Sequence, residues 1–125
     1  MTTAILLIAH GSREAKANDD LFALAEELRQ SGPYATVEPA FLELAKPTID
    51  VAGQICAASG ATRVVLLPYF LTAGVHVQRD LQNHRDALAR AFPAIEFVVA
   101  KPLGPHALLR QIVLDRIQET SEPEA

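Results

Sequence analysis

Two unbroken apolar runs constrain the fold of this chain more than any other feature. Residues 4–9 and 64–67 contain no charged or polar side chain. A strand that is apolar on both faces is typical of a parallel sheet covered by helices on both sides. The first run stops at His10-Gly11-Ser12 and the second at Pro68. The sequence therefore predicts a strand over 3–9 and a central strand over 63–68.

Helical spacing of apolar residues fills the segments between these strands. The pattern predicts helices over 15–30, from Pro47 to the stop at Gly60, over 75–92, and from about Pro105 onward. Two further strands are expected over 36–41 and 95–100. Pro39 cannot donate a hydrogen bond to a neighbouring strand, so the strand over 36–41 is expected at an edge of the sheet.

Strands and helices thus alternate four times, which predicts an α/β fold with a parallel sheet and right-handed crossovers. We expect a four-stranded sheet in the order 2-1-3-4, flanked by helices on both faces. Residues 1–119 form the single domain and residues 120–125 a polar C-terminal tail. In this strand order the crevice lies where the first and third strands end, and ligands bind at such a position.

Composition excludes several classes of function. The chain has 125 residues, one cysteine, no tryptophan and a net charge of −4. One thiol cannot form an intramolecular disulfide or a metal site with only cysteine ligands, and a reducing cytoplasm is the expected location. We expect no nucleic-acid partner, because the chain has no overall positive charge. The apolar runs are too short for a membrane span.

Polar side chains with metal-binding chemistry follow successive strands of the predicted sheet. His10 follows the first strand, Glu43 the second and His76 the third, while His106 lies near the start of the last helix. Two imidazoles and a carboxylate suit a divalent first-row metal and leave coordination positions open. His10 could instead only stabilise its turn, Glu43 could be a solvated carboxylate, and His76 could face water. For His106 a turn or pocket-lining role is favoured.

Other side chains at this edge indicate a place for an anionic ligand. Four cations fall there and could receive carboxylates, although each could be ordinary surface charge: Arg13, Lys46, Arg79 and Lys101. Tyr69 and Phe70 could form an apolar wall or belong to the core. Asp80, four residues after His76, could orient that imidazole. His84, on the apolar face of its helix, is interpreted as a partly buried packing residue, and Cys56 as a small hydrophobe.

Several motifs together resemble the sirohydrochlorin chelatases, in their short single-unit form. They are the segments 8–13, 41–43 with Pro47, and 67–71, followed by Gly74, His76 and Asp80. The resemblance implies a lyase-type, ATP-independent chelatase that uses no nucleotide. It also implies that His10, Glu43 and His76 hold the metal and face the tetrapyrrole. The implied substrates are sirohydrochlorin, which carries eight carboxylates, and a divalent metal: cobalt first, iron or nickel as alternatives.

The resemblance leaves the pathway open between cobalamin, sirohaem and nickel-cofactor biosynthesis. A different class of function is also open, a non-catalytic carrier of metal or tetrapyrrole with the same fold. A receiver-type signalling domain is disfavoured, because Pro68 and Tyr69 stand where its aspartate would end the third strand. A histidine phosphatase is disfavoured because Ala9, rather than an arginine, precedes His10.

We also expect a homodimer. One four-stranded unit offers a shallow crevice, whereas a tetrapyrrole is a broad, flat ligand that needs walls on both sides. The resemblance implies the same, since short members of that family pair two units as separate subunits, and a symmetric pair is the commonest oligomer. Leu81 and Leu88 are candidates for the contact, unless they belong to the core.

Overall fold

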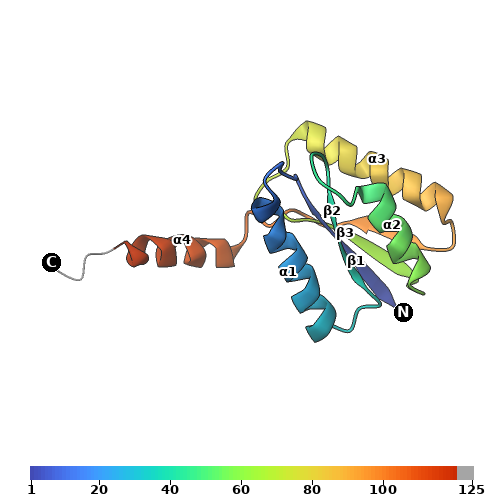
Figure 1. Ribbon diagram of the computed structural model, residues 1–125, viewed down its shortest axis with the longest axis horizontal. Coiled ribbons are helices and arrows are strands. Elements are labelled where there is room, and N and C mark those ends of the chain that lie inside the picture. The colour runs from blue at the N-terminus through green and yellow to red at the C-terminus, as the bar shows by residue number, and fades with distance from the viewer. Residues whose placement is uncertain (121–125) are drawn as a thin grey trace.

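A computed structural model describes residues 1–120 of the chain (Figure 1). Every expected strand and helix is present. Its elements are β1 (Thr3–Ala9), α1 (Ala15–Ser31), β2 (Val37–Phe41), α2 (Ile49–Ala58), β3 (Arg63–Pro68), α3 (Val75–Ala91), β4 (Glu96–Val99) and α4 (Ala107–Glu119). The bounds differ from the expected ones by two residues or fewer at most ends. The predicted polar tail begins with Thr120, which is the C-cap of α4. Residues 121–125 of that tail lie outside the described part of the chain.

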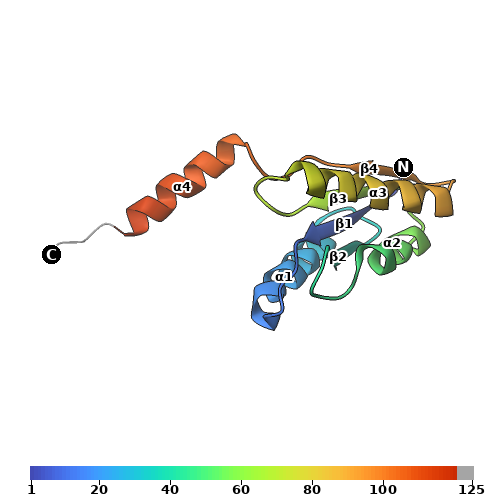
Figure 2. The same ribbon diagram turned by 90° about the horizontal axis from the view of Figure 1, so that it is seen from above.

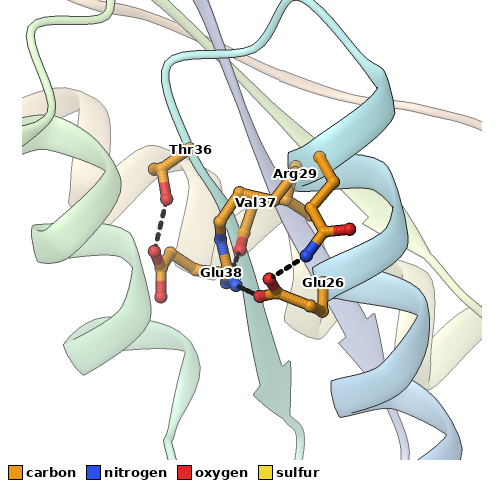
Figure 3. Close-up of polar contacts among 6 residues, drawn as sticks. Glu26, Arg29, Thr36, Val37 and Glu38 are labelled. Carbon is orange, nitrogen blue, oxygen red and sulfur yellow. Dashed lines mark hydrogen bonds and ion pairs between the residues drawn. The ribbon is translucent and has the colours of Figure 1, made fainter.

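The four strands form one parallel sheet in the order β2-β1-β3-β4, which confirms the prediction. β1 and β3 are the inner strands. β2 lies at an edge, as Pro39 indicated, and Pro39 pairs in register with Leu7 of β1. The edge strand is also tied to α1, because the Arg29 guanidinium donates both to the Val37 carbonyl and to Glu26 (Figure 3).

The core has two parts, one on each face of the sheet. On one face α2 and α3 cover residues such as Leu6 and Leu66, and on the other face α1 covers Leu7 and Val37. Figure 1 shows α1 on one side of the strands and α2 with α3 on the other. Leu6, Leu7 and Ile8 have no exposed surface. The unbroken apolar run of β1 is therefore explained by burial on both faces.

The start of α2 differs from the expectation that Pro47 begins the helix. Thr48 is the N-cap, and its hydroxyl accepts a hydrogen bond from the Val51 backbone N–H at 3.3 Å. The Pro47 carbonyl instead accepts from the Phe41 N–H at 3.0 Å. Threonine satisfies one of the free N–H groups of the first turn, so it takes the capping position and Pro47 remains outside the helix.

Leu81 and Leu88 are core residues, only 2% and 4% exposed, so they are excluded as the dimer contact. Leu88 packs against Gly53 of α2, where a Cβ atom would come within 2.8 Å of both Leu88 methyl carbons. Cys56 is fully buried in the same core, as expected for a small hydrophobe. Burial, with a further contribution from the Glu38 carboxylate, raises the pKa of its thiol to about 12.

α4 is the one described helix that covers neither face of the sheet. Figures 1 and 2 show it projecting away from the rest of the domain, and none of its residues is buried. The apolar spacing over this segment therefore predicts the helix correctly. It does not show that the apolar face packs against the rest of the described chain. In residues 1–120 no helix combines the length and apolar character that crossing a membrane would require.

Leu66→Ala should lower the free energy of unfolding by about 2–5 kcal/mol, because it leaves a cavity in the fully buried centre of the sheet. Val51→Ala is the control, since Val51 is 52% exposed on α2 and its truncation should change stability by less than about 0.5 kcal/mol. Urea denaturation followed by circular dichroism measures both. Equal effects would contradict the assignment of Leu66 to the core.

Candidate functional site

The parallel pairing of β1 with β2 continues past both strands and brings His10 beside Glu43. The Leu42 N–H donates to the Ala9 carbonyl and the Glu43 N–H donates to the His10 carbonyl, each at 3.0 Å. Both the imidazole and the carboxylate belong to exposed residues. The structure thus places an imidazole and a carboxylate on adjacent backbones at the carboxyl edge of the sheet.

Gly11 makes this approach possible. Its φ of 101° lies in the region that favours glycine. A Cβ atom at Gly11 would lie 1.8 Å from the Glu43 carbonyl oxygen, so no larger residue fits without moving one of the two loops. The next residue is held to α1 from both sides: the Ser12 N–H donates to Asn18 Oδ1 at 3.0 Å, and Asn18 Nδ2 donates to the Ser12 carbonyl at 2.8 Å.

The loop after β3 meets the end of β1 from the other side. The Tyr69 N–H donates to the Ile8 carbonyl at 2.6 Å. The rings of His10 and Phe70 stack with centroids 4.5 Å apart and an angle of 31° between planes. Phe70 also packs on the core, whereas Tyr69 is 36% exposed. Phe70 therefore covers one face of the His10 imidazole, whereas the Tyr69 ring is partly exposed.

His76 lies in the first turn of α3, on the same edge of the sheet, and is exposed. Asp80 is one turn further along and also exposed, but among residues 1–120 no hydrogen bond joins it to His76. Within this part of the chain no group of three or more His, Cys, Asp and Glu side chains is arranged to hold a metal ion. The structure therefore brings the backbones of His10 and Glu43 together, and His76 does not join them in a three-residue metal site within residues 1–120.

The four expected cations all occupy exposed positions: Arg13, Lys46, Arg79 and Lys101. In residues 1–120 none of them pairs with an acidic side chain. Lys101 lines a cavity of about 310 Å³ between the ends of β3 and β4, together with Gln78 and Leu81. The edge thus carries cationic side chains that are exposed and form no ion pair within the described part of the chain.

The remaining histidines have the roles expected of them. The His106 imidazole caps α4, since Nδ1 accepts a hydrogen bond from the Leu108 N–H at 3.1 Å, and it lines an apolar groove with Tyr69. His84 is half-buried between helices, with Nδ1 3.5 Å from a carboxylate oxygen of Asp50. Neither is among the proposed metal ligands.

Comparison with known proteins identifies the chain. The model of the CbiX family matches residues 4–120. The chain belongs to the CbiX family. This match covers the sheet, the His10–Glu43 edge and α4, so the whole described domain is family-like.

Named relatives of this CbiX-family chain are chelatases. It is 40% identical over 114 residues to the chloroplastic sirohydrochlorin ferrochelatase of Arabidopsis thaliana, covering 91% of this chain and 51% of that protein. It is 34% identical over 137 residues to a sirohydrochlorin cobaltochelatase of Methanopyrus kandleri, covering 93% of this chain and 95% of that protein. The chain spans about half the length of the first of these relatives and nearly all of the second.

A solved structure gives the same family and fold. The sirohydrochlorin chelatase SirB of Bacillus subtilis subspecies spizizenii, in complex with cobalt, superposes with a TM-score of 0.87 at 30% identity. The match covers 96% of this chain and 51% of that chain. One unit of the four-stranded type described above therefore corresponds to about half of the longer protein.

Sequence reasoning missed two contributors to this edge. Asn18 fixes the turn after His10 from within α1, and Gln78 lines the cavity beside Lys101. Neither residue type signals such a role by itself. The only available signal was position, since Asn18 lies in the first turn of a helix that follows a strand end and Gln78 lies two residues after His76.

Gly11→Ala should destabilise the protein more than Gly60→Ala. Both glycines have positive φ, 101° and 91°, so both substitutions carry the same conformational strain of about 1–2 kcal/mol. Only Gly11 has a neighbour in the way, because nothing lies within 4 Å of a Cβ at Gly60. The difference in urea unfolding free energy isolates the Gly11–Glu43 contact. Equal losses of unfolding free energy in the two variants would show that the loops carrying Gly11 and Glu43 can move apart without destabilising the protein.

Proposed function

We propose that this chain inserts a divalent metal into sirohydrochlorin without ATP, in tetrapyrrole biosynthesis of the cobalamin or sirohaem type. The adjacent placement of His10 and Glu43 at the ligand-binding edge of a CbiX-family sheet carries the proposal. The names of the relatives support both the tetrapyrrole and the reaction class. A reducing compartment such as the cytoplasm suits a chain whose single cysteine is a free, buried thiol.

Metal insertion joins the cation to the four ring nitrogens and releases two pyrrole protons. A neutral imidazole can either ligate a metal or accept a proton. We assign both tasks to His10 in sequence: its imidazole passes the metal to the ring and then accepts one pyrrole proton, with Phe70 covering one face of the imidazole. The second proton passes to His76 or to solvent water. Glu43 supplies an anionic oxygen ligand that neutralises part of the metal charge. His76, with Asp80 to orient it, completes the ligand set from α3 when metal and substrate are bound.

The substrate is held by charge around its rim and by apolar contact on its plane. Four exposed cations at the carboxyl edge of the sheet would receive carboxylates of sirohydrochlorin: Arg13, Lys46, Arg79 and Lys101. The partly exposed ring of Tyr69 and the ring of Phe70, which stacks on His10, would contact the flat macrocycle.

Cobalt is our first choice of metal, with iron and nickel as alternatives. Imidazole and carboxylate ligands accept all three, and affinity alone would favour nickel over cobalt over iron. Relatives named for cobalt and for iron both match this chain. Metal supply in the cell would then decide which ion is inserted. Parallel metallation assays with the three ions would rank them.

The alternative function is a carrier that binds metal or tetrapyrrole and catalyses nothing. Absorption spectroscopy of sirohydrochlorin with cobalt separates the two functions. A catalytic amount of a chelatase accelerates the spectral change of metallation over many turnovers, whereas a carrier shifts the spectrum only in proportion to the protein added.

His10→Ala and His76→Ala should each lower the metallation rate by about 100-fold or more, in line with losses from removed ligands and proton acceptors. His84→Ala is the matched control, because His84 lies between α2 and α3 and should leave the rate unchanged. Circular dichroism verifies folding of all three variants. Near-normal rates in the first two would refute the assigned site.

Replacing the exposed cations should weaken substrate capture more than turnover. Lys101→Met and Arg13→Met should raise the apparent KM for sirohydrochlorin several-fold with little change in kcat, and added salt should do the same to the parent protein. Arg116→Met on α4 serves as the control, since it lies outside the edge and its ion pair is with Glu119. Unchanged kinetics would place the carboxylates elsewhere.

A further inference from the structure

Leu44 has a backbone conformation that does not suit its side chain. Its φ of 66° is the only positive φ of a non-glycine residue between residues 1 and 120. In this region the Cβ atom crowds the following carbonyl oxygen, so residues other than glycine, asparagine and aspartate rarely adopt it. Leu44 directly follows Glu43, whose backbone N–H donates to the His10 carbonyl. The strain therefore lies within the candidate site.

The loop that carries Leu44 closes on itself. β2 ends at Phe41, whose N–H donates to the Pro47 carbonyl at 3.0 Å, and Phe41 forms a parallel bridge with Thr48. Residues 42–47 therefore leave a buried residue and return beside it. Tight reversals of the chain often need one residue with positive φ, and in this loop Leu44 is that residue.

Packing does not explain a leucine at this position. Leu44 is 52% exposed and belongs to neither part of the core. Glycine or asparagine would relieve the strain here without the loss of a core contact. Strained residues of this kind cluster where a protein binds ligands, because the side chain is needed in one place. Stability therefore does not account for Leu44, whereas a contact with a ligand does.

The neighbours of Leu44 indicate the chemistry of that ligand. Glu43 carries an exposed carboxylate, and Lys46, two residues after Leu44, is an exposed cation. At the same edge, after β3, Tyr69 is 36% exposed and Val75 is 68% exposed. The edge thus combines apolar side chains with charges of both signs. A flat apolar ring system that carries anionic groups and receives a cation matches this combination.

We propose that Leu44 contacts the apolar ring system of a tetrapyrrole, next to the carboxylate of Glu43 that we assign to the metal. Binding would remove the exposed half of the leucine from water, which the hydrophobic effect favours. With φ at 66°, the leucine is exposed while the Glu43 backbone stays paired with His10. This inference rests on the tetrapyrrole binding of the proposed function, and it adds an apolar binding residue from the loop after β2.

Alanine and glycine substitutions test the strain. Alanine retains the Cβ atom and glycine lacks it, so Leu44→Gly should unfold at a urea concentration about 0.5 M higher than Leu44→Ala. Ile55 provides the matched pair, because it is 46% exposed and lies within α2. There the order should reverse, since glycine weakens a helix relative to alanine. Circular dichroism measures the four midpoints. The same order at both positions would show that Leu44 is not strained and would overturn the proposal.

Binding of metal-free sirohydrochlorin tests the contact. Leu44→Ala and Leu44→Gly should each raise the dissociation constant about tenfold, because they remove apolar surface that the complex would bury. Leu44→Met retains an apolar side chain of similar volume and should bind within about threefold of the parent chain. Ile55→Ala should bind as the parent does, because Ile55 lies about two helical turns after Thr48. Absorption titration measures the four variants, and circular dichroism verifies that they fold.

Two results would refute the contact. Leu44→Ala and Leu44→Gly could bind sirohydrochlorin as tightly as the parent chain. Alternatively, Leu44→Ala could change the molecular mass measured by light scattering, which would place the leucine between copies of the chain.

The proposed function fails in a different way. A parent chain that binds sirohydrochlorin without metallating it, together with weaker binding by Leu44→Ala, would refute the insertion reaction and leave the contact intact. A parent chain that metallates sirohydrochlorin, with Leu44→Ala unaffected in binding, would do the reverse. A parent chain that does not bind sirohydrochlorin would refute both.

Discussion

The backbone ladder between β1 and its two neighbours is the interaction on which the rest of this structure depends. It sets the register that aligns Leu6 with Leu66 in one core, and Leu7 with Leu67 on the opposite face. Because the strands are parallel, it also brings their carboxyl ends to one edge. The same ladder runs two bonds further, through Leu42 and Glu43, and thereby becomes the frame of the candidate site.

The domain separates stability from chemistry along the strands. Side chains in the middle of β1 have no exposed surface, while His10, one residue past its end, is exposed. A buried imidazole or carboxylate without a partner would be costly, which explains why the proposed ligands for a metal and a charged tetrapyrrole lie where the sheet ends. Such side chains contribute little to packing, which leaves them free to be chosen for their chemistry.

The single unit and its longer relatives can be compared by the apolar surface that one unit leaves exposed. One unit buries both faces of β1 but leaves Val65, Leu67 and Val98 of β3 and β4 only partly buried. It also extends an apolar helix, α4, none of whose residues is buried by the described part of the chain. The CbiX-family relatives include proteins of about this length and proteins about twice as long.

The sequence by itself determined the elements and the order of the strands. The apolar run of β1, Pro39 at an edge and the alternation of strand and helix left one parallel arrangement, because only burial on both faces allows a strand without polar residues. It also indicated the site edge, since the residues that follow parallel strands must meet there. The positions of His10 and Glu43 were predictable for this reason.

Only the tertiary structure decided which apolar surfaces are covered. Leu81 and Leu88 are seven residues apart, and Leu108 and Ile112 are four apart; both spacings place two side chains on one face of a helix. Yet the first pair is in the core and the second is exposed. Periodicity records that a helix has an apolar face but not what lies opposite it. The close approach of Gly11 to Glu43 and the direction of α4 likewise depend on contacts between segments distant in sequence, which no local pattern encodes.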